Sequence, residues 1–179
     1  IDAIDTNTAC FILETVQAES GVIKPKPEWI KAVRAKCTET GTLLILDEIQ
    51  VGFGRTGSLW GFEQFDIVPD VLLLGKALGG GMPLGAFIAS KELMQTLSVD
   101  PILGHMTTFG GHPICCAAGK TAMVALLEEK MIEGVAAKAV LFLGNLKHPK
   151  IKNINAHGLM MAVQLESFEV IQAVIKGLL

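Results

Sequence analysis

The sequence predicts an α/β fold, in which a three-layer, mostly parallel sheet is followed by the start of a smaller α+β unit. Short, continuous apolar runs alternate with helical segments up to Ala89, which is typical of a parallel sheet covered on both faces. Half of the 179 residues are hydrophobic and 18% are charged, so the chain can build a packed core. After Pro149 the pattern changes to short strands and a terminal helix.

Four short apolar runs are the predicted strands of the sheet. They lie at residues 10–16 (CFILETV), 42–46 (TLLIL), 70–74 (DVLLL) and 84–89 (LGAFIA). Helical or crossover segments separate the first three runs, which predicts that these strands are parallel. The fourth run follows the third too closely for a long crossover, so we expect it to be antiparallel. The high apolar content also predicts that the strands are deeply buried.

The helices are predicted from apolar spacing and from signals at their ends. Apolar residues recur at i, i+3 and i+7 from Ile30 to Cys37, which predicts a helix from Pro27 to Thr40 with Gly41 as its C-cap. The other predicted elements are a short helical stretch at 59–65, a helix after the N-cap Ser90, a long helical pattern at 113–146, strands at 151–155 and 159–165, and a helix at 167–179.

The change of pattern near residues 147–152 is the expected domain boundary, which divides the chain into units of residues 1–147 and 148–179. The first residue is Ile1, not Met, and the last helix stops where a new element should begin. We therefore expect these residues to be a piece of a longer chain.

Charge and composition argue against several classes of partner. The net charge is −3 with acidic and basic residues interspersed, so we expect neither nucleic acid nor an anionic membrane as a partner. No apolar run is long enough to span a membrane. The four cysteines form no CxxC pair and the four histidines are scattered, which predicts reduced thiols in a cytoplasmic protein and no metal site.

Polar residues follow each of the first three predicted strands. The first strand ends near Glu14 and Glu19, Asp47 and Gln50 come after the second strand, and Lys76 comes after the third. Because ligands bind at the carboxyl edge of open α/β sheets, these residues form the candidate site. A buried Asp47 or Lys76 would need either a shared ligand or a mutual ion pair, and both interpretations remain open at this point.

Five stretches taken together resemble the class III aminotransferases, which include ornithine, acetylornithine and 4-aminobutyrate aminotransferases. They are ETVQAESG (14–21), LDEIQ (46–50), GFGRTG (52–57), PDVLLLGKALGGG (69–81) and TTFGGHP (107–113), in the family's order and near its spacing. The resemblance implies the fold of pyridoxal-phosphate-dependent transferases, with residues 1–147 as the later half of the cofactor-binding large domain and residues 148–179 as the beginning of the small C-terminal domain.

The resemblance also implies a pyridoxal 5′-phosphate site. Lys76 would form the Schiff base with the cofactor aldehyde, because its amine condenses with a carbonyl and can then carry a proton. Asp47 would face the pyridine nitrogen and favour the protonated ring, which is the better electron sink. Gln50 would donate a hydrogen bond to the ring hydroxyl oxygen.

Three further residues gain roles from the resemblance. Thr108 would donate to the cofactor phosphate of a neighbouring subunit, so a homodimer or a higher homo-oligomer is expected. Glu19 would be the substrate gate that pairs with an arginine late in the chain, and Glu14 would support the same polar edge. Two departures stand out: His112 replaces the family's usual asparagine, and NAHGL at 155–159 lacks the family's arginine. We assign no substrate role to that last segment.

The implied activity is transfer of an amino group from an ω-amino acid, of the ornithine or acetylornithine type, to 2-oxoglutarate. Two alternatives stay open. One is another class III enzyme with the same cofactor, such as a 4-aminobutyrate aminotransferase, an aminomutase or a decarboxylase, because all use the same electron sink. The other is an inactive fragment of such an enzyme.

The segment GFGRTG at 52–57 also matches the spacing of a dinucleotide-binding loop. Asp47 and Glu48 stand between the apolar strand and its first glycine, and they would repel a pyrophosphate. We therefore interpret the segment as a glycine-rich turn in which Arg55 supports the local carboxylates. The glycines at 79–81 follow Lys76 and so form no Walker loop; we expect them to let the backbone pass close to a cofactor or another subunit.

Overall fold

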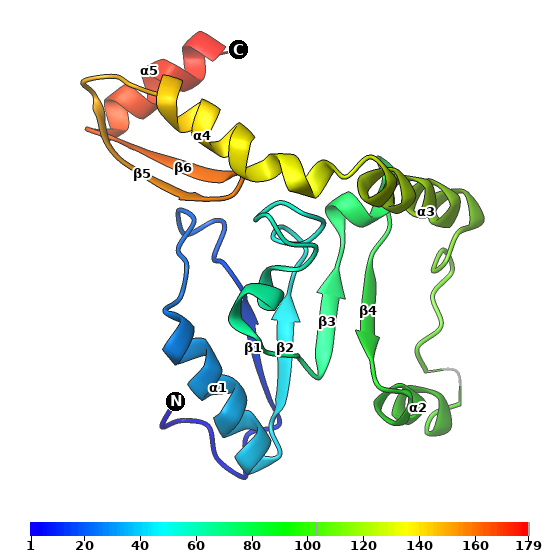
Figure 1. The fold of residues 1–179 in the computed structure, drawn as a ribbon. Coiled ribbons are helices and arrows are strands. Elements are labelled where there is room, and N and C mark those ends of the chain that lie inside the picture. The colour runs from blue at the N-terminus through cyan, green and yellow to red at the C-terminus, as the bar shows by residue number, and fades with distance from the viewer. Residues whose placement is uncertain (103, 179) are drawn as a thin grey trace.

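A four-stranded sheet forms the centre of the computed structural model, which describes residues 1–102 and 104–178. Its strands are β1 (Cys10–Glu14), β2 (Leu43–Asp47), β3 (Val71–Leu74) and β4 (Ala86–Ala89), in that spatial order (Figure 1). β1 pairs with β2 and β2 with β3 in parallel, whereas β4 is antiparallel to β3. The predicted strands and their directions are confirmed.

Helix α1 (Pro27–Thr40) covers one face of the sheet and forms the main core with it. It begins at Pro27 and ends at Gly41, whose φ of 74° lies in the left-handed region that glycine adopts at low cost. Both ends agree with the sequence prediction. The main core contains these buried residues: Ile4, Ile30, Val33, Cys37, Leu44, Leu46, Phe65 and Ile67.

The opposite face of the sheet carries large exposed side chains. Ile12 is 58% exposed and Phe87 is 46% exposed, and both point away from the α1 face because side chains alternate along a strand. The prediction of deeply buried strands is therefore wrong for β1 and β4, and the third layer is not seen in the described residues. Composition reports how apolar a strand is, but only packing decides what covers it.

Short helical elements follow the strands. The 3-10 helix η1 (Gly61–Phe65) occupies the predicted helical stretch, and η2 (Lys76–Gly79) begins directly after β3 and Gly75. Helix α2 (Lys91–Val99) follows β4, and the Ser90 hydroxyl caps it by accepting a hydrogen bond from the Leu93 amide at 3.2 Å. The predicted role of Ser90 as an N-cap is confirmed.

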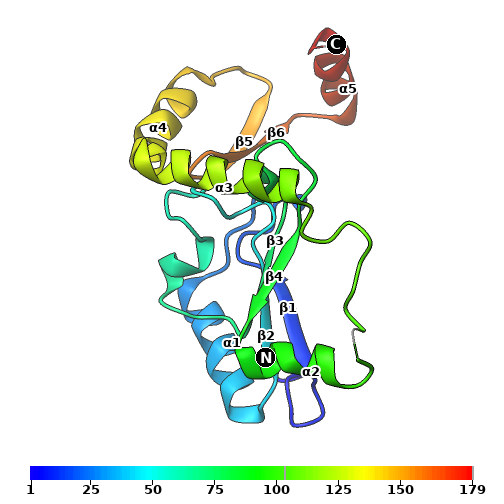
Figure 2. The ribbon, with the colours of Figure 1, turned by 90° about the vertical axis from the view of Figure 1, so that its right-hand side faces the viewer.

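The long helical pattern divides into α3 (Pro113–Glu128), the 3-10 helix η3 (Met131–Gly134) and α4 (Val135–Asn145). Figures 1 and 2 show α3 lying across the end of the sheet where β3 ends. Gly119 permits this placement, since a Cβ there would collide with the Leu78 carbonyl oxygen. None of the helices formed by the described residues is both long and apolar enough to cross a lipid bilayer.

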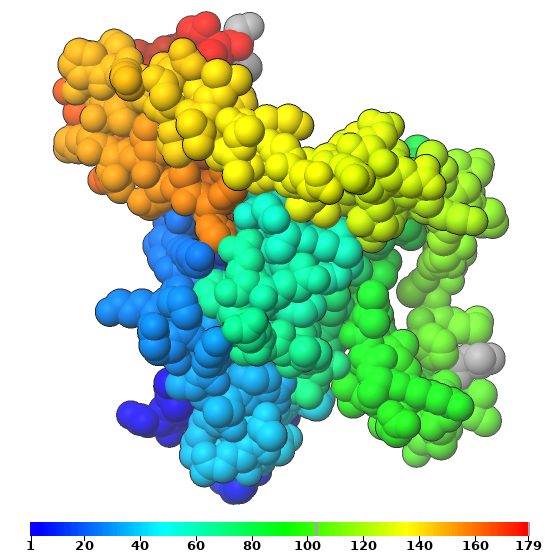
Figure 3. Space-filling view, in the orientation of Figure 1, coloured from blue at the N-terminus to red at the C-terminus, as the bar shows by residue number. Residues whose placement is uncertain are grey.

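The chain ends with the hairpin β5 (Ile151–His157) and β6 (Met160–Leu165), followed by α5 (Phe168–Leu178). The hairpin rests on the earlier residues, as the contact between the orange and the blue and cyan surfaces shows (Figure 3). Met160 packs against Val16, Val22 and Val51 in a second core cluster. The division of the chain at residue 147 stays a prediction.

Candidate functional site

The carboxyl ends of β1, β2 and β3 lie side by side and form what we call the rim. Glu14 is the register partner of Asp47, and Asp47 is the register partner of Leu73. Lys76 comes shortly after Leu73 in the sequence, beyond Leu74 and Gly75. Two parallel crossovers thus bring the predicted residues of three distant segments to one edge of the sheet, at the upper end in Figure 1.

Lys76 opens η2, directly after the buried Gly75. Its φ of 44° lies in the left-handed region, where a lysine backbone is strained. The side chain is exposed, and it takes part in none of the ion pairs found among the described residues. The interpretation of Asp47 and Lys76 as a mutual ion pair is therefore wrong for this structure, and the amine remains free for another partner.

Asp47 ends β2 and is half-buried. Its Oδ1 accepts a hydrogen bond from the Ile49 amide at 2.9 Å, which holds the carboxylate over the turn that follows. Within the described part of the chain, the other carboxylate oxygen accepts no hydrogen bond. Asp47 therefore has one oxygen committed to its own backbone and one available to a ligand.

Two further polar residues of the rim bond to each other. The Gln50 Nε2 atom donates to Glu19 Oε1 at 3.0 Å, although the two residues lie in separate loops. A glutamine amide carries two N–H donors, so the second remains for another acceptor. Glu14 makes a local bond instead, because its Oε2 accepts from the Ala18 amide at 3.0 Å and so holds the turn after β1.

Glu48 is a buried polar residue next to the rim that the sequence analysis did not include in the candidate site. Its side chain is fully buried, and its carboxylate accepts hydrogen bonds from the Thr15 hydroxyl, the Gly61 amide at 2.8 Å and the Phe62 amide at 3.0 Å. Burial raises the pKa of this carboxyl, while the three hydrogen bonds oppose that rise. A second acidic residue directly after an apolar strand was the available signal, since alternation sends it to the face opposite Asp47.

The amides that bind the Glu48 carboxylate lie after the glycine-rich segment 52–57, whereas the Gly52 amide of that segment donates to the Glu48 backbone carbonyl at 2.9 Å. The Gly61 and Phe62 amides, which begin η1, already bind the Glu48 carboxylate. The predicted role of Arg55 is wrong: its side chain is exposed and makes no ion pair within the described residues, whereas its carbonyl accepts a hydrogen bond from the Leu159 amide. The Glu48 carboxylate is instead held by the backbone amides of Gly61 and Phe62.

Thr108 lies in the connection between α2 and α3, where it is exposed. In the described residues, no hydrogen bond joins its side chain to the rim. Figure 2 shows this connection running outside the sheet. The structure therefore unites Glu14, Glu19, Asp47, Gln50 and Lys76 at or next to the rim, and leaves Thr108 apart.

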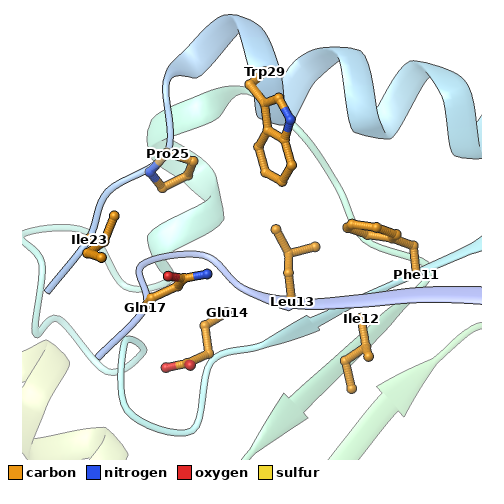
Figure 4. Close-up of a pocket in the computed structure, with 8 residues that line it drawn as sticks. All are labelled: Phe11, Ile12, Leu13, Glu14, Gln17, Ile23, Pro25 and Trp29. Atoms are coloured by element: carbon orange, nitrogen blue, oxygen red, sulfur yellow. The ribbon is translucent and has the colours of Figure 1, made fainter. Parts of the chain in front are cut away.

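A pocket of about 400 Å³ flanks the rim along the outer edge of β1 (Figure 4). Glu14 and Gln17 form its polar end, while Trp29 of α1 faces Leu13 across it. Glu14 is the residue that this pocket shares with the rim. Among the described residues, no group of three or more potential metal ligands is present.

Comparison with known proteins extends over nearly the whole chain. The family described as Aminotransferase class-III matches residues 1–178. The acetylornithine aminotransferase of Caldanaerobacter subterraneus subsp. tengcongensis is 38% identical over 182 aligned residues, which cover 99% of this chain and 45% of that protein. The acetylornithine aminotransferase of Methanosarcina mazei is 41% identical and covers 92% of this chain and 41% of that protein. The chain thus spans less than half the length of these relatives.

Solved structures share the fold as well. The ornithine aminotransferase of Toxoplasma gondii superposes with a TM-score of 0.81 at 37% identity and covers 91% of this chain and 39% of that one; PLP partially occupies its active site. An aminotransferase of Bacillus anthracis gives a TM-score of 0.85 at 29% identity, covering 94% of this chain and 41% of that one. The sheet and its rim therefore correspond to part of a larger fold.

Proposed function

Because the chain belongs to the class-III aminotransferase family, we propose that its rim binds pyridoxal 5′-phosphate. We further propose that the full protein transfers an amino group from an ω-amino acid, of the ornithine or acetylornithine type, to 2-oxoglutarate. The observation that carries this proposal is the rim itself. Among the described residues, a carboxylate with one free oxygen and an amine without an ionic partner lie at, or just after, the ends of neighbouring parallel strands.

The groups at the rim fit the chemical features of this cofactor. The Lys76 amine would hold the cofactor through its aldehyde, and the free Asp47 oxygen would accept from the protonated ring nitrogen. The second Gln50 N–H would donate to the ring hydroxyl oxygen. Thr108 would reach the cofactor phosphate of a second subunit, which makes a homodimer part of the proposal. When bound, the cofactor supplies an electron sink for the carbon next to the amine.

The residues then have separate tasks. Lys76 would be the positioned base, since its exposed amine could take a proton from the substrate carbon and return it. Asp47 keeps the ring nitrogen protonated through its charge. Glu19 accepts a hydrogen bond from Gln50 and would be the substrate gate that pairs with an arginine late in the full protein, while Glu14 holds the turn that precedes Glu19.

The substrate class rests on the relatives, two of which are named acetylornithine aminotransferases and one an ornithine aminotransferase. A direct test is amino transfer by the full chain with acetylornithine or ornithine as donor, in the presence and absence of 2-oxoglutarate. We expect turnover only with the oxo acid. Turnover that continues without it would instead favour an aminomutase or a decarboxylase.

The cofactor site has its own test. Borohydride reduction of the full chain with bound pyridoxal 5′-phosphate should label Lys76, as peptide mass mapping would show. Lys76→Ala should abolish the label, whereas Lys120→Ala, at an exposed position of α3, should leave it unchanged. A label on a different lysine would refute the assignment.

A further inference from the structure

The buried Glu48 carboxylate joins segments that are far apart in the sequence. Through its side chain it holds the chain after β1 at Thr15 and the start of η1 at Gly61 and Phe62. Its backbone adds two links: its amide donates to the Leu73 carbonyl of β3 at 3.0 Å, and its carbonyl accepts from the Gly52 amide at 2.9 Å. One residue therefore connects three strand ends and a loop.

Two neighbouring glycines, Gly52 and Gly61, lie so close to Glu48 that a side chain would not fit at either position. A Cβ on Gly61 would lie 3.1 Å from Glu48 Oε1 and would also collide with Val51. A Cβ on Gly52 would lie 2.9 Å from the Glu48 carbonyl oxygen. Both distances are too short for a side chain without rearrangement. Gly52 and Gly61 thus permit the backbone to approach Glu48 closely, Gly52 at its carbonyl oxygen and Gly61 at its carboxylate.

Glu48 is also a buried carboxyl group that has no cationic partner among the described residues. Among the described residues no Lys, Arg or His pairs with it, and its three partners are all hydrogen-bond donors. An ionised carboxylate is acceptor-only, so this donor set suits the charged form. Burying an anion is costly. If the side chain at this position served packing alone, an apolar side chain of similar size would fill the space without that cost.

We propose that Glu48 is a positioning residue, which fixes the backbone at the end of β2 and thereby aims the Asp47 carboxylate at the cofactor ring nitrogen. The two residues are adjacent and face opposite sides of the sheet. Asp47 is held through the Ile49 amide, one residue beyond Glu48. Any rotation of the Glu48 backbone therefore moves both the Asp47 side chain and the donor that orients it. This inference rests on the proposed function, because it assumes that Asp47 faces the ring.

The test compares two cofactors on the full chain: pyridoxal 5′-phosphate and its 1-deaza analogue, in which carbon replaces the ring nitrogen. Only the first can bond to Asp47, so the ratio of their dissociation constants, measured by absorbance titration, reports that bond. A hydrogen bond to a charged group corresponds to a ratio of about tenfold to a hundredfold in the wild type. Asp47→Ala should bring the ratio close to one.

Glu48→Gln should lower that ratio by about tenfold, because one carboxylate oxygen becomes an NH2 group, which would face either the Gly61 amide or the Phe62 amide and displace the end of β2. The matched control is Glu63→Gln. Glu63 is an exposed glutamate in the same loop region, and its side chain accepts only from the Trp60 amide. The control should keep the wild-type ratio.

The outcomes separate the two proposals. A wild type that binds both cofactors equally would remove the role of Asp47 and, with it, the inference. In a second outcome, the wild type binds pyridoxal 5′-phosphate more tightly than the analogue, and Glu48→Gln weakens the binding of both cofactors equally and so keeps the ratio. That outcome would overturn this inference but leave the proposed function in place.

If Glu48→Gln does not fold, Thr15→Val decides, since it removes one donor to Glu48 and keeps the side-chain shape. The ratio should then fall by about threefold. An unchanged ratio in that variant would also overturn the inference.

Discussion

At the scale of single residues, the polar groups at the rim differ in how many hydrogen-bond or ion-pair partners they have within the protein. Glu48 uses both carboxylate oxygens inside the protein, Asp47 uses one, and the Lys76 amine uses none in ion pairs among the described residues. Free donors and acceptors at the end of a parallel sheet are what a ligand needs. The residues with the fewest partners are therefore the ones we assign to the cofactor.

Asp47→Ala in the full chain should lower kcat by about a hundredfold or more, because it removes a fixed charge from the reacting ring. The loss of stability should be small, since the side chain makes only one local hydrogen bond. Steady-state kinetics and thermal unfolding measure the two effects. As a control, Asp66→Ala, which breaks an exposed ion pair with Lys31, should keep kcat. An Asp47→Ala enzyme with wild-type kcat would contradict the assignment.

His157 provides a prediction about pH. Burial, and then the nearby Lys24, lower the pKa of this imidazole below its usual 6.5, and its buried Nε2 has no hydrogen-bond partner in the part of the chain that the structure describes. A base whose pKa is depressed in the folded state stabilises the protein fully above pH 6.5, and the stabilisation is lost as the pH falls through its folded pKa.

Urea unfolding of the full chain should therefore show a loss of stability below pH 6.5 that is smaller in His157→Gln, since glutamine does not titrate. His148→Gln, at an exposed position, is the matched control and should keep the wild-type profile. Identical profiles for the wild type and His157→Gln would show that His157 does not contribute.

At the scale of elements, helix α3 lies close to the segment that carries Lys76. Gly119 makes this possible, because η2 passes so near that the Leu78 carbonyl occupies the place of a side chain. Gly144 in α4 has open space around its Cα instead. A side chain would therefore collide with a neighbour at Gly119 but not at Gly144. Substitution of each glycine by alanine tests this difference.

Gly119→Ala should destabilise the full chain by about 1–3 kcal/mol, through overpacking against η2. Gly144→Ala should change stability by less than about 1 kcal/mol, in the stabilising direction, because alanine is the better helix former. Denaturant midpoints measure both variants. If the two substitutions had the same effect, α3 would not be packed against η2 as described.

At the scale of the whole molecule, large apolar side chains remain exposed on the sheet and on the last helices. Phe142 is 59% exposed and Phe168 is 68% exposed, in addition to Ile12 and Phe87. Soluble proteins seldom leave contiguous apolar surface of this kind uncovered. The relatives that this chain matches are more than twice as long, so these surfaces have candidate partners in the remainder of such a protein.

Residues 1–179 produced alone should therefore bind the dye ANS strongly, and should show little or no amino transfer. The full-length acetylornithine aminotransferase of Methanosarcina mazei, measured at equal concentration, is the reference and should bind much less dye. ANS fluorescence and an aminotransferase assay provide the measurements. Weak dye binding by the shorter chain would mean that its apolar surfaces cover one another in solution.

The sequence predicted the sheet well and the site in part. The features that depend on local apolar spacing or on end signals were predictable. They are the strand positions, the antiparallel direction of β4, the helix ends at Pro27 and Gly41, and the Ser90 cap. Arg55 and Glu48 were not. Their roles depend on which backbone amides the loop folds toward the sheet, and no spacing rule encodes that.

The sequence by itself determined the alternation of strands and helices, and through its motifs the family, since both depend on residues near one another in the chain. Only the tertiary structure decided that Glu14, Asp47 and Leu73 share a register and that Glu48 accepts bonds from Gly61 and Phe62. It also decided which face of the sheet remains open. The reason is physical: hydrogen bonds and burial join residues that lie far apart in sequence, and their energies are set only when the chain has closed those loops.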